Sequence, residues 1–127
     1  HFTTLSDINM PVVLFDRVCL PELFSTVVAD GVQSAQKATQ HLLDNRSRRI
    51  AFIGGANHLD IVKRRKHGYL EALRENKIPI ERELVVCRKI AYEEGKIATE
   101  TLLSLPEPPD AILAKNDTLA FAAMEVI

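Results

Sequence analysis

Tryptophan is absent from this sequence of 127 residues, and aromatic residues make up only 6% of it, so the core is expected to be mainly aliphatic. The two cysteines, Cys19 and Cys87, are too few for a disulfide scaffold and have no metal-ligand spacing. They fit a reduced, intracellular setting. No apolar run approaches the roughly 18 residues that cross a membrane. The net charge of -1 excludes a general affinity for nucleic acids or anionic lipids.

Charge is nevertheless unevenly distributed along the chain. Residues 1–30 carry one basic residue against four acidic ones, a net charge of -3, whereas residues 46–77 carry nine Lys and Arg against three acidic residues, a net charge of +6. A basic stretch of this kind is most simply a solvated helix face. A nucleic-acid surface usually adds interleaved aromatic residues, and only Tyr69 is nearby.

Apolar runs alternate with stretches of helical periodicity. With 46% hydrophobic and 26% charged residues, the chain has the composition of one globular domain. Helices are predicted over four segments, with Asp30, Asp60 and Asp117 as N-caps. The predicted strands are 12–15, 26–29, 50–55, 83–87 and 111–114, and the predicted helices are 31–45, 61–76, 93–105 and 117–127. This alternation predicts an α/β fold with a Rossmann-like parallel sheet flanked by helices.

The same patterns predict which faces are buried. Continuous apolar runs such as 12–15 and 50–55 are typical of strands covered on both faces. In the helix predicted over 93–105, the expected inward stripe consists of Ile97, Ala98, Thr101, Leu102 and Leu105.

Polar residues follow three of the predicted strands. Ligands of open α/β sheets bind outside the carboxyl ends of the strands. Asp16 follows the first strand, Gly54-Gly55 ends the third, and Asn116 follows the last. Asp16 has a local turn or ion pair as its alternative role, while Asn116 carries an amide that suits a polar ligand. The glycine pair lacks the GxGxxG pattern of a dinucleotide site.

Arg65 gives the sharpest signal for a binding site. It lies three residues after Val62 and four before Tyr69, on the apolar stripe of its predicted helix. A buried arginine needs partners, and its planar fork suits hydroxyls or carboxylates. The alternative is an arginine whose guanidinium extends to the edge of the helix.

Catalytic motifs are lacking. The sequence contains no GxSxG, no HExxH and no suggestive Cys/His spacing, and its histidines are scattered. We therefore expect no enzymatic activity, no cofactor and no metal site.

Taken in order, several segments resemble the LacI/GalR family of bacterial transcriptional regulators. They are "PVVLFDR", "RRIAFIGG", "R..GYLEAL" and "PDAILAKNDTLAFAAMEVI", with "VVAD", "IP.E.ELV" and "EEG" between them. The resemblance implies a periplasmic-binding-protein-like core of type I, two Rossmann-like lobes with a small ligand between them. Residues 1–26 correspond to the end of the N-terminal lobe, and residues 27–127 correspond to the first part of the C-terminal lobe. The expected core is therefore incomplete.

The resemblance also implies roles for individual residues. Asp16, Arg65 and Asn116 match ligand contacts of the family, and Ile90 falls where a ligand-stacking ring is common. Arg46 replaces the usual glycine at a helix end. Phe121 lies in the region near the family's dimer interface.

The implied function is effector sensing by a cytoplasmic regulator. A sugar-like effector controls binding to operator DNA through a helix-turn-helix domain that this sequence does not contain. The partners are thus the effector, operator DNA and a second copy of the chain, without a membrane. A periplasmic sugar-binding protein of an ABC transporter, which shares the fold, is the alternative.

Overall fold

A computed structural model describes residues 11–15, 22–88 and 91–127. The chain divides into two compact units, residues 1–30 and residues 31–127. The lobe boundary predicted between residues 26 and 27 stays a prediction.

The first unit contains two short parallel strands, β1 (Val13–Phe15) and β2 (Ser25–Val27). The prediction of a strand covered on both faces is wrong for β1, because Val13 is 61% exposed and Phe15 is 79% exposed. Both strands of this two-stranded sheet are short, and of their apolar side chains only Leu14 is partly buried.

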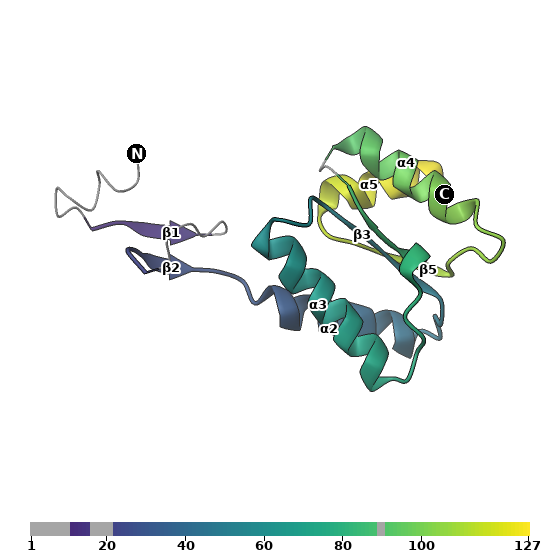
Figure 1. Cartoon of the computed structure of the whole chain (residues 1–127), viewed down its shortest axis with the longest axis horizontal. Coiled ribbons are helices and arrows are strands. Elements are labelled where there is room, and N and C mark those ends of the chain that lie inside the picture. The colour runs from purple at the N-terminus through teal and green to yellow at the C-terminus, as the bar shows by residue number, and fades with distance from the viewer. Residues whose placement is uncertain (1–10, 16–21, 89–90) are drawn as a thin grey trace. The chain divides into compact units, whose positions relative to one another are not determined.

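The second unit is a three-layered α/β structure (Figure 1). Its sheet has the strand order β4-β3-β5 and is parallel throughout. The strands are β3 (Ile50–Gly54), β4 (Val85–Cys87) and β5 (Ala111–Ala114), and the helices are α2 (Gly31–Asp44), α3 (Asp60–Glu75), the 3-10 turn η1 (Arg82–Leu84), α4 (Tyr92–Leu103) and α5 (Asp117–Val126). Helices α2 and α3 pack together, as do α4 and α5, and the two pairs cover opposite faces of the sheet.

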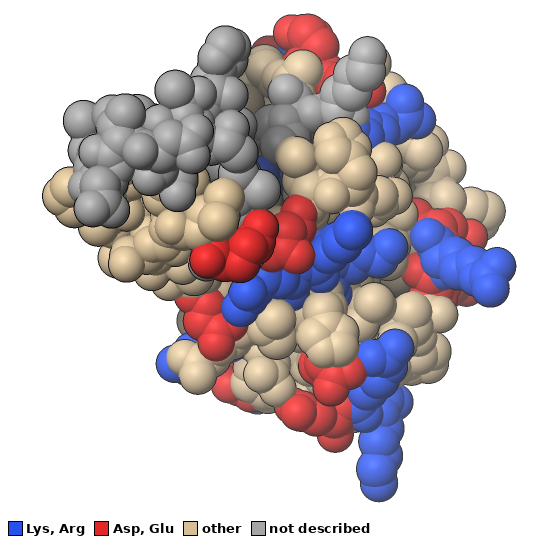
Figure 2. Space-filling view, turned by 60° about the vertical axis from the view of Figure 1, so that its left-hand side comes forward, with Lys and Arg blue, Asp and Glu red and all other residues tan. Residues whose placement is uncertain are grey.

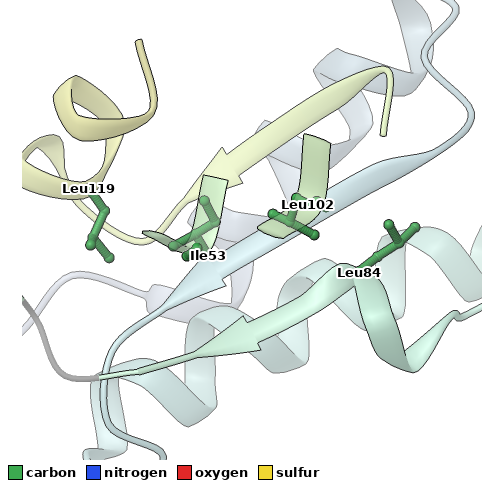
Figure 3. Close-up of a cluster of buried hydrophobic side chains, with 6 residues drawn as sticks. Ile53, Leu84, Leu102 and Leu119 are labelled. Carbon is green, nitrogen blue, oxygen red and sulfur yellow. The ribbon is translucent and has the colours of Figure 1, made fainter. Parts of the chain in front are cut away.

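Strand β3 is the centre of two hydrophobic clusters. Ala51 and Ile53 pack with side chains of α4 and α5, and Figure 3 shows Ile53 beside Leu102 and Leu119. Ile50 and Phe52 instead pack toward α2 and α3. Successive side chains of a strand point to opposite faces, so an all-apolar strand contributes to both clusters. All five residues of β3 are buried, as its apolar run predicts.

Helix α4 buries Ala98 and Leu102, as predicted, but not the whole predicted stripe. Ile97 and Thr101 are exposed, whereas Gly95 and Thr99 are buried. A Cβ at Gly95 would lie 2.8 Å from the Cβ of Ala122, so α5 approaches α4 at its smallest residue. The hydroxyl of Thr99 donates to the Gly95 carbonyl at 2.8 Å, which satisfies this polar group inside the helix pair. Small residues thus set this contact, although they add little to an apolar pattern.

Two predicted helix caps are also wrong. Asp60 is the first residue of α3, and Leu59 occupies the N-cap position without a side-chain hydrogen bond. Asp117 is likewise the first residue of α5, and the N-cap is Asn116. Carboxylates in a first helical turn are still favourable, because they face the positive end of the helix dipole.

Ion pairs and hydrogen bonds tie together the amino end of the sheet. Asp110 accepts hydrogen bonds from the backbone N–H groups of Arg48 and Arg49, at 2.7 and 3.1 Å. The Arg49 guanidinium pairs with Glu81 and with Glu83, the latter at 2.7 Å. These carboxylates raise the pKa of Arg49. Arg49 thereby connects the start of β3 with the segment around η1. The strand predicted over 83–87 begins only at residue 85, because η1 occupies residues 82–84.

Basic and acidic side chains are interspersed on the face shown in Figure 2, where Lys and Arg lie beside Asp and Glu. In α3, Lys63, Arg64 and His67 are exposed, as expected for a solvated helix face.

Candidate functional site

The carboxyl ends of β3 and β5 meet at one edge of the sheet. The Lys115 N–H donates to the Ile53 carbonyl at 2.8 Å, which continues the ladder one residue beyond β5. The parallel pairing thus fixes Lys115, Asn116 and Asp117 at this edge. β1 pairs with β2 in a separate two-stranded sheet of the first unit.

Arg65 extends from α3 toward this edge. Its neighbours on the inward stripe, Val62 and Tyr69, are buried, while Arg65 itself is half-buried. Its Nη1 donates a hydrogen bond to the carbonyl oxygen of Lys115. In the described part of the chain this is the one hydrogen bond of the guanidinium, so its other N–H groups remain available to a ligand.

Tyr69 anchors α3 on the sheet one turn after Arg65. Its hydroxyl donates to the Ile50 carbonyl at 2.8 Å, and its ring stacks on Phe52 with 5.4 Å between the centroids. Burial raises the pKa of Tyr69 to about 12, so the hydroxyl stays protonated at neutral pH. This anchor fixes the helix face from which Arg65 extends.

A close contact between α2 and α3 sets the position of both helices. A Cβ at Gly68 would lie 2.0 Å from the Val32 carbonyl oxygen, so only glycine fits there. Near the start of α2, a Cβ at Gly31 would meet the Arg65 side chain at 3.6 Å. Helix α2 therefore packs against the stem of Arg65.

Asn116 begins α5 and faces the same edge. Its Oδ1 accepts the Leu119 N–H at 3.3 Å, which makes it the N-cap of the helix. Sequence reasoning gave this role to Asp117. Because the cap engages the amide oxygen, the amide NH2 is the part of Asn116 that is directed to other partners.

These residues line one cavity of about 360 Å³ within the second unit. Its polar lining consists of Ser34, Arg65, Lys115, Asn116 and Asp117. Its apolar lining consists of Ala35, Ala38, Phe52, Leu113, Ala114 and Ala120. A cavity of this size, largely apolar with a few convergent polar groups, has the character of a small-molecule site.

The structure brings together two of the four predicted ligand contacts, Arg65 and Asn116. Asp16 and Ile90 lie outside the described residues. Lys115 and Ser34 also line the cavity, and the sequence reading did not single them out. Lys115 could have been predicted as a cavity residue from its position, because it directly follows a predicted strand and precedes Asn116.

We also searched the described part of the chain for a metal site, a reactive cysteine and a membrane-spanning helix. No group of three His, Cys, Asp or Glu side chains there is placed to hold a metal ion. Cys87 is half-buried and does not line the cavity, and burial raises the pKa of its thiol. No helix among the described residues has the length and apolar character to span a membrane. The cavity offers hydrogen bonding and apolar contact, which suit non-covalent binding of a small polar molecule.

The parallel sheet, the helices on both of its faces and the cavity at its edge are together typical of a ligand-binding domain of the periplasmic-binding-protein class. Residues 2–127 match the family described as periplasmic binding proteins and sugar binding domain of the LacI family. The chain therefore belongs to this family. The predicted family resemblance and the predicted fold, parallel sheets flanked by helices, are both confirmed.

Known relatives are longer than this chain. A probable HTH-type transcriptional repressor, ExuR of Bacillus subtilis, is 33% identical over 119 residues, which cover 94% of this chain and 36% of ExuR. The chain thus spans about a third of the length of the curated relatives that it matches.

Two solved structures show the same fold. A regulatory protein of the LacI family from Chloroflexus aggregans superposes with a TM-score of 0.87 at 31% identity, covering 98% of this chain and 45% of that one. A complex of the transcriptional regulator CelR with cellobiose gives a TM-score of 0.82 at 31% identity, covering 96% and 38%.

Proposed function

We propose that this chain is part of the ligand-sensing core of a LacI-type transcriptional regulator. A small sugar-like effector binds at the cavity and controls operator binding through a helix-turn-helix domain outside this sequence. The observation that carries the proposal is the meeting of the Arg65 guanidinium and the Asn116 amide at one cavity. A structural relative at 31% identity is a complex with cellobiose, which supports a sugar-like effector.

The proposed binding chemistry is hydrogen bonding by preformed donors. The guanidinium of Arg65 is oriented by its bond to the Lys115 carbonyl, and its free N–H groups form a planar fork. Asn116 adds amide donors, and Leu113 and Ala120 add an apolar surface. Asp16 and Ile90 are further proposed contacts that rest on the family resemblance alone.

Regulation requires that the effector distinguish two states of the protein. An effector shifts an equilibrium only by its difference in affinity between the states. The coupling is reciprocal, so bound operator also changes effector affinity. We propose that this coupling acts in a cytoplasmic homodimer. The repressor name of the ExuR relative favours this role over that of a transporter's binding protein.

Substitution of Arg65 tests the proposed function. A thermal-shift screen of mono- and disaccharides, their acids and their phosphates first identifies an effector of the intact protein. Arg65→Ala is expected to lower the affinity for that effector roughly tenfold or more, since charge-assisted hydrogen bonds contribute about 1.5–3 kcal/mol. Calorimetry measures the affinity, and operator binding measured without effector should not change.

Lys63→Ala is the matched control, because Lys63 is an exposed cation of the same helix and does not line the cavity. It should leave effector affinity unchanged. Equal affinity of Arg65→Ala and the unmodified protein would contradict the role of Arg65.

A further inference from the structure

The start of α2 lies directly against the side chain of Arg65. Gly31 is the first residue of α2 and is buried. A Cβ at Gly31 would lie 3.6 Å from the Arg65 Cγ and 3.9 Å from the Arg65 nitrogen. The backbone of Gly31 does not have a positive φ, so its conformation does not require glycine. What glycine provides at this position is therefore space beside the stem of Arg65.

Helix α2 is fixed against α3 and cannot retreat from a larger side chain at position 31. The Val32 carbonyl, in the residue after Gly31, lies where a Cβ at Gly68 would come within 2.0 Å of it, so the two backbones touch. Further along α2, the Gln36 amide donates to the Glu75 carboxylate at 2.9 Å. A larger side chain at position 31 would thus displace the flexible stem of Arg65 before it displaced either helix.

The Arg65 side chain is in contact at both of its ends. Its stem lies beside Gly31, and its Nη1 donates to the carbonyl oxygen of Lys115 at the end of β5. Between these contacts it lines the cavity together with Ser34, which lies one turn after Gly31 in α2. Displacement of the stem would turn the guanidinium away from the Lys115 carbonyl, because the stem connects the two contacts.

Resting on the proposed function of the cavity, we propose that Gly31 is a positioning residue for effector binding. The absence of a side chain lets the Arg65 stem lie against α2, and this packing sets the direction of the guanidinium. Alanine fits at position 31, because the three nearest atoms would lie 3.4 to 3.9 Å from its Cβ, in ordinary van der Waals contact. Valine adds two γ carbons, and its stiff χ1 limits how far they can turn away from the Arg65 stem. The size of the side chain at position 31 therefore sets effector affinity through Arg65.

The first experiment observes the Arg65 side chain without a ligand. NMR spectra of the arginine Nε–Hε groups are recorded on the purified protein, and Arg65→Lys identifies the signal of Arg65. In the unmodified protein and in Gly31→Ala, the relaxation of this signal should be that of a restrained side chain. In Gly31→Val the signal should shift and show the fast motion of an unrestrained arginine. An unchanged, restrained signal in Gly31→Val overturns the inference.

The second experiment measures affinity by calorimetry in a double-mutant cycle. The probe is whichever of glucose, glucuronate and glucose 6-phosphate the unmodified protein binds most tightly. Gly31→Ala should leave its affinity unchanged, whereas Gly31→Val should weaken it, up to the roughly tenfold loss expected of Arg65→Ala. In the Arg65→Ala protein, Gly31→Val should cause no further loss, because two residues that act through one contact are not additive.

Two controls separate this role from a general effect on α2. Lys37→Val adds the same side chain at an exposed position of α2 outside the cavity, and it should leave the affinity unchanged. The Cβ of Arg64 is the other near neighbour of position 31, at 3.4 Å, so Gly31→Val should keep its effect in an Arg64→Ala protein. If Gly31→Val does not fold, Gly31→Ser, which adds a single γ atom, replaces it in both experiments.

Each outcome decides the inference. Equal affinity of Gly31→Val and the unmodified protein overturns it and leaves the proposed function standing. An equal loss with and without Arg65 also overturns it, since Gly31 would then act on the fold and not on Arg65. If none of the three probes binds, the NMR comparison decides alone. The proposed function fails separately, when Arg65→Ala leaves effector affinity unchanged.

Discussion

Two residues at helix ends, Arg46 and Lys77, have a left-handed backbone with φ of 72° and 57°. Each lies just after a helix that ends in a Schellman motif. After α2, the Ser47 N–H donates to the Leu42 carbonyl at 3.1 Å, and after α3, the Ile78 N–H donates to the Leu73 carbonyl at 2.9 Å. Residues with a Cβ are disfavoured in this conformation by about 1–2 kcal/mol. Arg46 and Lys77 therefore each hold a side chain in a backbone conformation that favours glycine.

Arg46→Gly is therefore expected to raise the free energy of unfolding by about 0.5–1 kcal/mol, after subtraction of the entropy that glycine adds to the unfolded state. Urea denaturation measures the change. His67→Gly is the control, because His67 is exposed within α3, and glycine there should cost about 1 kcal/mol. A less stable Arg46→Gly protein would show that the Arg46 side chain outweighs the backbone strain.

The sequence alone could not decide which of two neighbouring polar residues, Asn116 or Asp117, is the N-cap of α5. Asn116 and Asp117 are both good N-cap residues, so composition alone cannot assign the cap. The backbone bond from Lys115 N–H to Ile53 fixes where β5 ends and thereby makes Asn116 the cap. Arg65, in contrast, could be located from the sequence, because the periodicity of α3 identifies its inward face.

At the scale of elements, the contact between helices α2 and α3 depends on one residue. A Cβ at Gly68 would lie 2.0 Å from the Val32 carbonyl oxygen and 3.0 Å from the Gln36 nitrogen. Backbone atoms cannot move away as a flexible side chain can. The same contact orients α3 and so the side chain of Arg65.

Gly68→Ala is expected to destabilise the protein by about 1–3 kcal/mol or more, because the helices must separate to admit the methyl group. It should also weaken effector binding through the displacement of α3. Gly31→Ala is the matched control in the same helix pair, since its nearest contact would be 3.4 Å from the Arg64 Cβ. Equal stability of Gly68→Ala and Gly31→Ala in urea would contradict this account.

Element boundaries were predictable within about two residues in the second unit, where periodicity and burial agree. The buried face of α4 was predictable only in part, because Gly95 approaches α5 closely while Ile97 remains exposed. The pattern of apolar residues reports hydrophobicity alone. The packing of α4 on α5 depends instead on side-chain size, because the two helices approach closely at Gly95.

At the scale of the whole molecule, α5 carries an apolar face that the described residues leave uncovered. Phe121 is 61% exposed and Met124 is 70% exposed, while Leu119 and Ala122 on the same helix are buried. Large exposed apolar side chains that lie together are typical of interfaces. We propose that this face contacts a second copy of the protein.

Phe121→Glu is expected to shift the intact protein from dimer to monomer, because the charge would be desolvated in the interface. Light scattering at several protein concentrations measures the shift. Ile80→Glu, an exposed apolar position before η1, should leave the dimer intact. A monomer already present in the unmodified protein would contradict the proposed dimer, and a dimer that tolerates Phe121→Glu would exclude this face.

The alternation of strands and helices was sufficient to predict the α/β fold, because hydrophobic periodicity follows directly from the local sequence. The order of motifs was sufficient to suggest the family. Only the tertiary structure placed Lys115 beside Arg65 at one cavity and assigned the α5 cap to Asn116. These features depend on which strand ends meet and on how closely the helices approach each other. Both are decided by contacts between residues that lie far apart in the sequence.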